Sequence, residues 1–120
     1  MTINRPGHID DLFNLKGKSV IITGGGSGIG MQAVTAFAQA GCRITIADIK
    51  SPEKVCLQEK REYGVECLSL ELDITIENSV KKMIESTLKR FGGIDILVNN
   101  VGGAIISDTL RTALSDWHKI

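Results

Sequence analysis

The sequence predicts an α/β fold in which a parallel sheet of about four strands is built from alternating strands and helices. Four short runs rich in β-branched residues are separated by segments of ten or more residues with helical spacing. Five glycines within positions 24–30 follow the first of these runs at once. Strands that are joined by helices in this way lie parallel, with right-handed crossovers.

The first strand is predicted at residues 19–23, an unbroken apolar run typical of a strand buried on both faces. The helix after it should end at Gly41, because glycine readily adopts the left-handed conformation that closes a helix. Residues 1–16 are expected to form an arm, and residues 17–120 one domain. The buried face of the first helix is predicted to consist of Ile29, Ala33, Ala36, Phe37 and Ala40.

The second unit begins with a strand at residues 43–48. Ser51 is expected to cap the helix that follows, with proline in its first turn, since serine accepts hydrogen bonds from free helix amides. This helix should run over residues 52–63 and end at Gly64. The charged stretch 59–62 is interpreted as a face of the helix that lies in solvent.

A third strand is predicted at residues 66–72, and Thr75 can cap the helix after it. Gly92 and Gly93 should end that helix, ahead of a fourth strand at residues 94–99. A polar loop then leads to residues 114–117, which resemble the first turn of a further helix. The apolar stripe of the third helix is predicted as Val80, Met83, Ile84, Thr87, Leu88 and Phe91.

Composition excludes several classes of protein. The 120 residues hold 14 basic and 14 acidic side chains, a balance that argues against a nucleic-acid partner. No apolar run approaches the length that spans a bilayer, and the first 13 residues lack the apolar centre of a secretory signal. Three cysteines without a CxxC pattern indicate free thiols in a reducing compartment, with neither a disulfide nor a metal site. A cytoplasmic protein is therefore expected.

The glycine-rich turn predicts a site for a phosphate group. A turn that opens a helix after a buried strand directs free N–H groups and the positive end of the helix dipole at a ligand. Gly24, Gly28 and Gly30 can divide three tasks: the tight turn, close approach of the diphosphate, and close packing of helix on strand. Asp48 ends the second strand, 18 residues after Gly30, at the spacing of a carboxylate that binds ribose hydroxyls. This context predicts a dinucleotide site.

Three motifs resemble those of the short-chain dehydrogenases/reductases. Residues 23–30 match the pattern Thr-Gly-x-x-x-Gly-x-Gly, and Asp73-Ile74 resembles the Asp-Val pair that the family carries at the adenine. Residues 99–102 read Asn-Asn-Val-Gly, where the family has Asn-Asn-Ala-Gly. The resemblance runs from about Leu15 to the last residue and implies a partial Rossmann fold with strand order 3-2-1-4 and helices on both faces.

The resemblance also implies which residues bind cofactor. Asn99 has two open interpretations, as a residue that ties neighbouring strands together or as one that contacts the cofactor. Val101 is bulkier than the family's alanine, which a backbone contact with the cofactor would tolerate. At the diphosphate the resemblance implies Gly24, Ser27, Gly28 and Ile29. At the adenosine ribose it implies Asp48 and Ile49, and at the adenine Asp73 and Ile74. Along the ribose edge it implies Asn100, Val101 and Gly102.

Charge favours NAD over NADP. A 2′-phosphate beside the Asp48 carboxylate would be repelled, whereas a ribose hydroxyl can donate a hydrogen bond to it. NADP-dependent members of the family usually place arginine or lysine at the positions that Ser27 and Ile49 occupy here. We therefore expect NADH to bind at least tenfold more tightly than NADPH.

The family's catalytic residues have no counterpart in this sequence. Hydride transfer in the family uses a tyrosine with a lysine four residues later and a serine, because an unperturbed phenol is a poor base at neutral pH. Tyr63 is the one tyrosine, and Cys67 stands four residues after it. We therefore predict that residues 17–120 are the NAD(H)-binding part of an oxidoreductase that acts on an alcohol or carbonyl substrate, and that this part stops before the catalytic segment. The chain itself is expected to hold no catalytic residue and to have no activity alone.

Two other functions are weighed against this prediction. A non-catalytic NAD-binding or regulatory module that pairs with another protein would share the glycine-rich turn. A flavin or S-adenosylmethionine domain is disfavoured by the glycine spacing and by the later Asn-Asn-x-Gly. In this chain the fourth strand would also be an edge, so we expect homo-oligomers or self-association through that edge.

Overall fold

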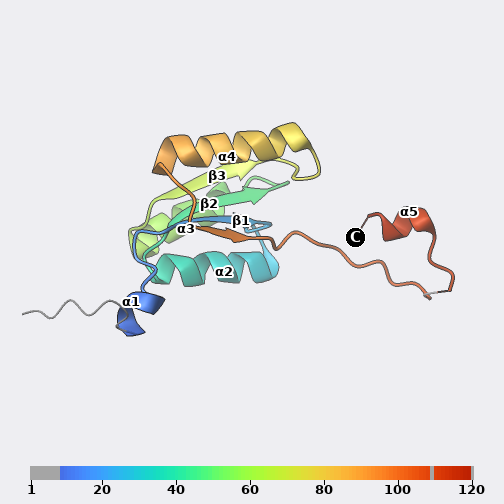
Figure 1. Cartoon of the computed structure of the whole chain (residues 1–120), viewed down its shortest axis with the longest axis horizontal. Helices are drawn as coiled ribbons and strands as arrows, with labels where there is room; N and C mark the ends of the chain where they lie inside the picture. The colour runs from blue at the N-terminus through green and yellow to red at the C-terminus, as the bar shows by residue number, and fades with distance from the viewer. Residues whose placement is uncertain (1–8, 109, 120) are drawn as a thin grey trace, which may run out of the picture.

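A four-stranded parallel sheet forms the centre of the computed structural model, which describes residues 9–108 and 110–119 (Figure 1). The strands lie in the order β3-β2-β1-β4, which confirms the predicted fold class and strand order. In chain order the elements are α1 (Ile9–Phe13), β1 (Ser19–Thr23), α2 (Gly28–Gln39), β2 (Arg43–Asp48), α3 (Glu53–Tyr63), β3 (Cys67–Glu71), α4 (Glu77–Phe91), β4 (Ile96–Val98) and α5 (Leu114–Trp117).

The two central strands are buried because their β-branched side chains pack on both faces of the sheet. Every residue of β1 is buried, and Val20 lies opposite Ile44 of β2 on one side and Ile96 of β4 on the other. The register of β1 with β2 ends at Thr23 and Ala47. The glycine-rich turn and the Asp48 carboxylate therefore emerge at the same edge of the sheet.

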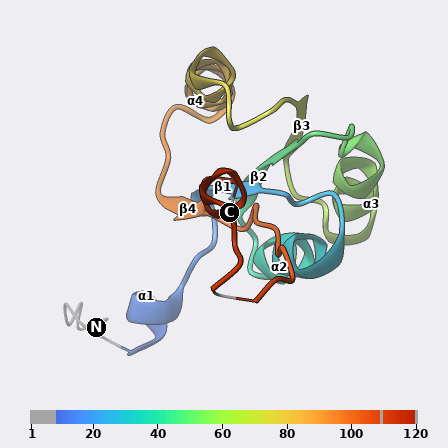
Figure 2. The same ribbon diagram turned by 90° about the vertical axis from the view of Figure 1, so that its right-hand side faces the viewer.

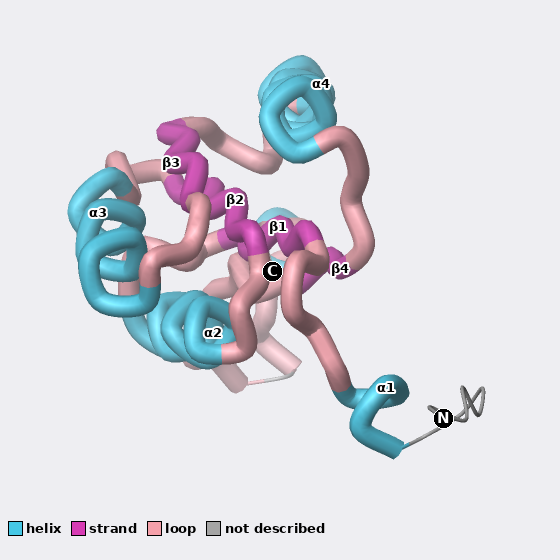
Figure 3. Tube along the Cα trace, turned by 90° about the vertical axis from the view of Figure 1, so that its left-hand side faces the viewer, coloured by secondary structure: helices cyan, strands magenta, loops and turns pink. Residues whose placement is uncertain are grey.

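Helices cover both faces of the sheet, as expected. Figures 2 and 3 show α2 and α3 together on one face and α4 on the other. The larger core lies under α2 and α3, where Ile22 and Ile46 pack with Val34, and the smaller core joins Ile21 to Met83 of α4. No helix of the described residues is long and apolar enough to cross a membrane.

The predicted buried face of α2 is wrong by about one position. The buried residues are Gly30, Val34 and Ala38, whereas Ile29 is 82% exposed. The face is shifted because Gly30 contacts the turn. Val34 and Ala38, four and eight positions later on the same side of the helix, therefore face the sheet. In α4 the predicted stripe is confirmed at Met83, Thr87 and Phe91, while Ile84 and Leu88 are exposed.

Several local predictions are also wrong. Pro52, not Ser51, is the N-terminal boundary residue of α3, and α4 begins after Ile76 without a hydrogen bond from Thr75 to its first turn. Glu59 is 2% exposed rather than solvated, because Thr35 Oγ1 of α2 donates a 2.7 Å hydrogen bond to its carboxylate.

The two ends of the chain lie away from the sheet (Figure 1). Part of the predicted arm forms α1, whereas residues 1–8 lie outside the described residues. After β4 the chain runs outward to α5, where Leu114 and Trp117 are exposed. β4 is shorter than predicted, and Leu97 at its centre is 54% exposed.

Candidate functional site

A cavity of about 430 Å³ opens at the carboxyl ends of the strands. It lies where β1 has β2 on one side and β4 on the other, so that the connections from β1 and β4 leave in different directions. Open α/β sheets bind their ligands at such a point. The lining residues are Gly24, Ser27, Ala47, Asp48, Ile49, Leu72, Asp73, Ile74, Thr75, Asn100, Val101 and Gly102.

Nine of the eleven predicted cofactor residues line this cavity, and the other two, Gly28 and Ile29, start α2 beside it. The residues that the sequence analysis missed are Ala47, Leu72 and Thr75. The parallel register could have indicated the first two, because Ala47 precedes the last residue of β2 and Leu72 follows the last residue of β3. Leu72 also donates a backbone hydrogen bond to Asp48 O over 2.9 Å.

The glycine-rich turn leaves donors available for an anion. Gly24 has a φ of +69° and donates a 2.7 Å hydrogen bond from its amide to Ala47 O, which pins the start of the turn to β2. Ser27, the N-terminal boundary residue of α2, makes no side-chain capping bond. The amides of the first turn of α2 therefore have no intrahelical partner and lie in the positive field of the helix N-terminus.

Gly30 brings α2 unusually close to the turn. A Cβ atom at this position would lie less than 3.0 Å from Gly24 O and from Asn100 Nδ2, so no larger residue fits without movement of the helix. This close approach is the helix-on-strand packing that the sequence assigned to one of the glycines.

Asp48 is held against the glycine-rich turn by backbone amides. Its Oδ2 accepts a 2.9 Å hydrogen bond from Gly26 N, and its Oδ1 accepts a longer one of 3.3 Å from Lys50 N. The side chain is half-buried, so one side of the carboxylate still faces the cavity that it lines. A carboxylate only accepts hydrogen bonds when ionised, so it suits a hydroxyl donor.

A second carboxylate, that of Asp73, lies on the β3 side of the cavity. Thr75 donates to Asp73 Oδ1 twice, from its hydroxyl over 2.7 Å and from its amide over 2.9 Å. These two hydrogen bonds lower the pKa of Asp73 below its ordinary value, the hydroxyl having the larger effect. Ile74, between them, adds apolar surface to the same wall.

Thr23 and Asn100 join the end of β4 to the glycine-rich turn. The buried Thr23 hydroxyl donates to Val98 O over 3.3 Å and accepts from Asn100 N over 3.1 Å. Asn100 Nδ2 in turn donates to Gly24 O over 3.2 Å. Asn99 lines a separate apolar groove beside α4 and not this cavity.

The cavity has the donor and acceptor pattern that a nicotinamide dinucleotide requires. The amides at the N-terminus of α2 could bind a diphosphate, the two carboxylates could accept hydrogen bonds from hydroxyl or amine donors, and the isoleucines give the cavity apolar walls. Tyr63 lies elsewhere, at the end of α3, where its hydroxyl accepts a 3.1 Å hydrogen bond from Gln39 Nε2. Among the described residues no cluster of three or more histidine, cysteine or acidic side chains could hold a metal ion.

Comparison with known proteins reveals relatives over most of the chain. The family model of the short chain dehydrogenases matches residues 18–120. An uncharacterised oxidoreductase of Thermotoga maritima is 36% identical over 107 residues, which are 88% of this chain and 42% of that protein. The chain thus spans less than half the length of this curated relative.

Solved structures show the same similarity in three dimensions. A short-chain type dehydrogenase/reductase from Mycobacterium marinum is 32% identical, with a TM-score of 0.84 over 95% of this chain and 47% of its own. The L-sorbose reductase of Gluconobacter frateurii, solved with NADPH and L-sorbose, is 32% identical, with a TM-score of 0.79 over 85% of this chain and 40% of its own. The chain belongs to the short-chain dehydrogenase family, whose fold binds nicotinamide cofactors.

Proposed function

We propose that this chain is the NAD(H)-binding part of an oxidoreductase that transfers hydride between a nicotinamide cofactor and an alcohol or carbonyl substrate. The observation that carries the proposal is the single cavity that unites the glycine-rich turn, both carboxylates and the residues after β4. Oxidoreductases among its relatives support the same chemistry. Because the chain spans less than half of their length, the substrate and the catalytic step belong to the proposal.

Each part of the cavity has a role in holding the cofactor. The amides around Ser27 and Gly28 would bind the diphosphate, and Asp48 would accept hydrogen bonds from the adenosine ribose. Asp73 and Ile74 would flank the adenine. The remaining proposed contacts are Gly24 and Ile29 at the diphosphate, Ile49 at the ribose, and Asn100, Val101 and Gly102 along the ribose edge. When bound, the nicotinamide ring supplies the hydride chemistry.

Asp48 makes NAD the cofactor that fits this chain best. The sorbose reductase of similar structure was solved with NADPH, so the fold itself also accommodates a 2′-phosphate. Here the Gly26 amide fixes the Asp48 carboxylate where a 2′-phosphate would approach it, and within the described part of the chain no arginine or lysine lines the cavity. Like charges about 4 Å apart repel by about 1 kcal/mol in water and about 4 kcal/mol near a protein surface. Since 1.4 kcal/mol is tenfold, NADH should bind at least tenfold more tightly than NADPH.

The described residues supply binding and no proton transfer. Tyr63 lies at the end of α3 and does not line the cavity, so the chain alone should bind cofactor weakly and transfer no hydride. The alternative is a non-catalytic NAD-binding or regulatory module. The coding sequence after Ile120 separates the two: a serine followed by Tyr-x-x-x-Lys supports the enzyme, and a stop codon supports the module.

The fourth strand is a surface for self-association. Among the described residues β1 is the only strand that pairs with β4, and the exposed Leu97 gives the free edge of β4 an apolar side chain. We also propose a cytoplasmic location, which three free, buried cysteines support.

The proposal is tested by titrating the purified chain with NADH and with NADPH in parallel, with nicotinamide fluorescence as the signal. The expected result is saturable binding of both cofactors, with a dissociation constant at least tenfold lower for NADH. Equal or reversed affinities would contradict the role of Asp48. The absence of binding at millimolar concentrations of either cofactor would contradict the dinucleotide site itself.

A further inference from the structure

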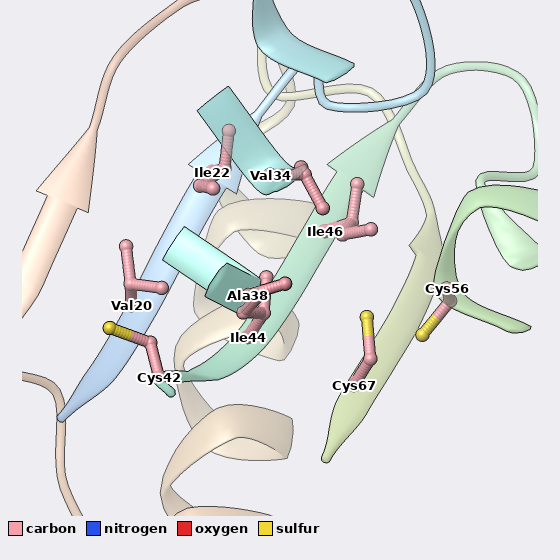
Figure 4. Close-up of a cluster of buried hydrophobic side chains, with 9 residues drawn as sticks. All are labelled: Val20, Ile22, Val34, Ala38, Cys42, Ile44, Ile46, Cys56 and Cys67. Carbon is pink, nitrogen blue, oxygen red and sulfur yellow. The ribbon is translucent and has the colours of Figure 1, made fainter. Parts of the chain in front are cut away.

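Two buried cysteines on neighbouring elements direct their sulfur atoms toward each other. Cys56 of α3 and Cys67 of β3 are each 3% exposed and belong to the core between α3 and the sheet. Figure 4 shows both side chains from their separate elements, with the two sulfur atoms facing one another. Cys42 lies elsewhere in this core, and its thiol donates a 3.3 Å hydrogen bond to Leu15 O.

The two thiols are close enough to shift each other's pKa in opposite directions. The neighbouring Cys67 thiol lowers the pKa of Cys56, against the opposing effect of burial, and Lys60 one helical turn later lowers it further. The neighbouring Cys56 thiol is the largest cause that raises the pKa of Cys67, and burial adds to it. Cys56 is therefore the better nucleophile of the pair, and Cys67 holds a proton beside it.

The backbone already brings the two residues together. The connection from α3 to β3 is short, and it turns at Gly64, whose φ is +67°. α3 packs directly on β3. A disulfide requires Cβ atoms that lie close together, and Figure 4 shows the Cys56 sulfur directed toward the Cys67 side chain.

We propose that Cys56 and Cys67 form a site of reversible oxidation that closes a disulfide between α3 and β3. The oxidant class is a low-molecular-weight disulfide such as oxidised glutathione. The Cys56 thiolate attacks one sulfur of that disulfide and releases the first small thiol. Cys67 then gives up its proton and attacks the Cys56 sulfur of the mixed disulfide, which releases the second small thiol. The protein dithiol loses two hydrogen atoms, and the oxidant is reduced to two thiols.

The site lies between the elements that carry the two carboxylates of the cavity. α3 follows the loop after Asp48, and β3 leads to Asp73. A covalent tie between α3 and β3 would restrain both sides of that cavity. Because both sulfurs are buried, an oxidant reaches them only when α3 opens locally, so the reaction should be slower than with exposed thiols.

The test treats the reduced, folded chain with oxidised glutathione, counts free thiols and maps the peptides without reduction. The thiol count should fall from three to one, with a mass loss of about 2 Da and a single linked pair of peptides that contain Cys56 and Cys67. Dithiothreitol should restore all three thiols. A count that stays at three, or a link that forms only in denaturant, would overturn the proposal.

Single substitutions sharpen the assignment. Cys42→Ser is the matched control and should leave the link intact, because its thiol bonds to Leu15 O and lies apart from Cys56 and Cys67 in Figure 4. Cys67→Ser should trap glutathione on Cys56 as a stable mixed disulfide, about 305 Da heavier. A link to Cys42, or glutathione on Cys42 in place of Cys56, would refute the pairing. The wild-type peptide map decides the question even where a variant fails to fold.

Discussion

Replacing Gly30 with alanine should destabilise the chain and weaken the dinucleotide site together. The added Cβ would lie less than 3.0 Å from Gly24 O and Asn100 Nδ2, whereas non-bonded carbon contacts are relaxed at about 3.5–4 Å. The start of α2, or the atoms that it meets, must therefore move by about 1 Å or more. Both neighbours belong to the site, so the amides of α2 would move away from the diphosphate position.

The magnitude follows from two opposing effects. Overpacking costs about 1–3 kcal/mol and sometimes more, whereas alanine is favoured over glycine within a helix by about 1 kcal/mol. Because the clash at Gly30 involves a backbone carbonyl that cannot rotate away, we expect a net loss of about 2 kcal/mol in the free energy of unfolding. For a chain of this size the melting temperature should fall by about 10 °C.

Thermal unfolding followed by circular dichroism, together with an NADH titration, measures both effects. Gly93→Ala is the matched control, because no atom lies within 4 Å of its added Cβ and its φ is ordinary. This control should change the unfolding free energy by less than about 0.5 kcal/mol. Equal stability of Gly30→Ala and wild type, or equal losses in both variants, would refute the argument from close packing.

Three further predictions concern charge, pH and the sheet edge. Asp48→Asn should reduce the preference for NADH over NADPH to less than about threefold in parallel titrations, because it removes the charge that repels the 2′-phosphate; an unchanged preference would contradict this. Thr75→Val should raise the pKa of Asp73 toward its ordinary value, since the larger of its two stabilising hydrogen bonds is lost. Above its unfolded pKa this carboxylate adds to the stability of the folded chain, and that contribution is lost as the pH falls through the lower folded pKa. Because the folded pKa is higher in the variant, the contribution should be lost at a higher pH. Carboxyl NMR titrations of Asp73 that superimpose for wild type and variant would refute the assignment. Leu97→Lys should shift the chain toward monomer in sedimentation equilibrium, because a charge on the free edge of β4 opposes strand pairing, and unchanged association would exclude this edge.

The strands and the helix ends were predicted well, because local sequence features encode both. β-branched runs at β1 and β2 and glycines at helix ends are local features, and Gly64 and Gly92 do end α3 and α4 with φ values of +67° and +79°. The strand order, by contrast, came from resemblance to the family, because local patterns do not specify which strands are neighbours.

Side-chain environments were predicted less well because tertiary contacts decide them. The face that α2 buries depends on how closely Gly30 approaches the turn, which hydrophobic spacing does not encode. Glu59 lies in a charged stretch, yet the Thr35 hydroxyl provides a partner from another helix and allows its burial. Thr75 is of a residue type that often caps helices, but its hydroxyl donates a hydrogen bond to Asp73 instead.

Most residues that line the cavity could be named from the sequence because the motifs follow strand ends, and their binding of a cofactor stays a prediction. Parallel strands bring their carboxyl ends to one edge, so Gly24, Asp48 and Asp73 meet at one cavity although they are far apart in sequence. Thr75, which fixes the Asp73 carboxylate, was missed because its contact with that side chain appears only in three dimensions.

An NADH titration followed by amide NMR of the ¹⁵N-labelled chain tests the central claim most directly. The account predicts that the amide signals of Gly24, Ser27 and Gly28 shift together with those of Asp48 and Asp73, along one saturable curve. Shifts that instead cluster at the apolar groove beside α4, or no shifts at millimolar NADH, would contradict the assignment of this cavity as the dinucleotide site.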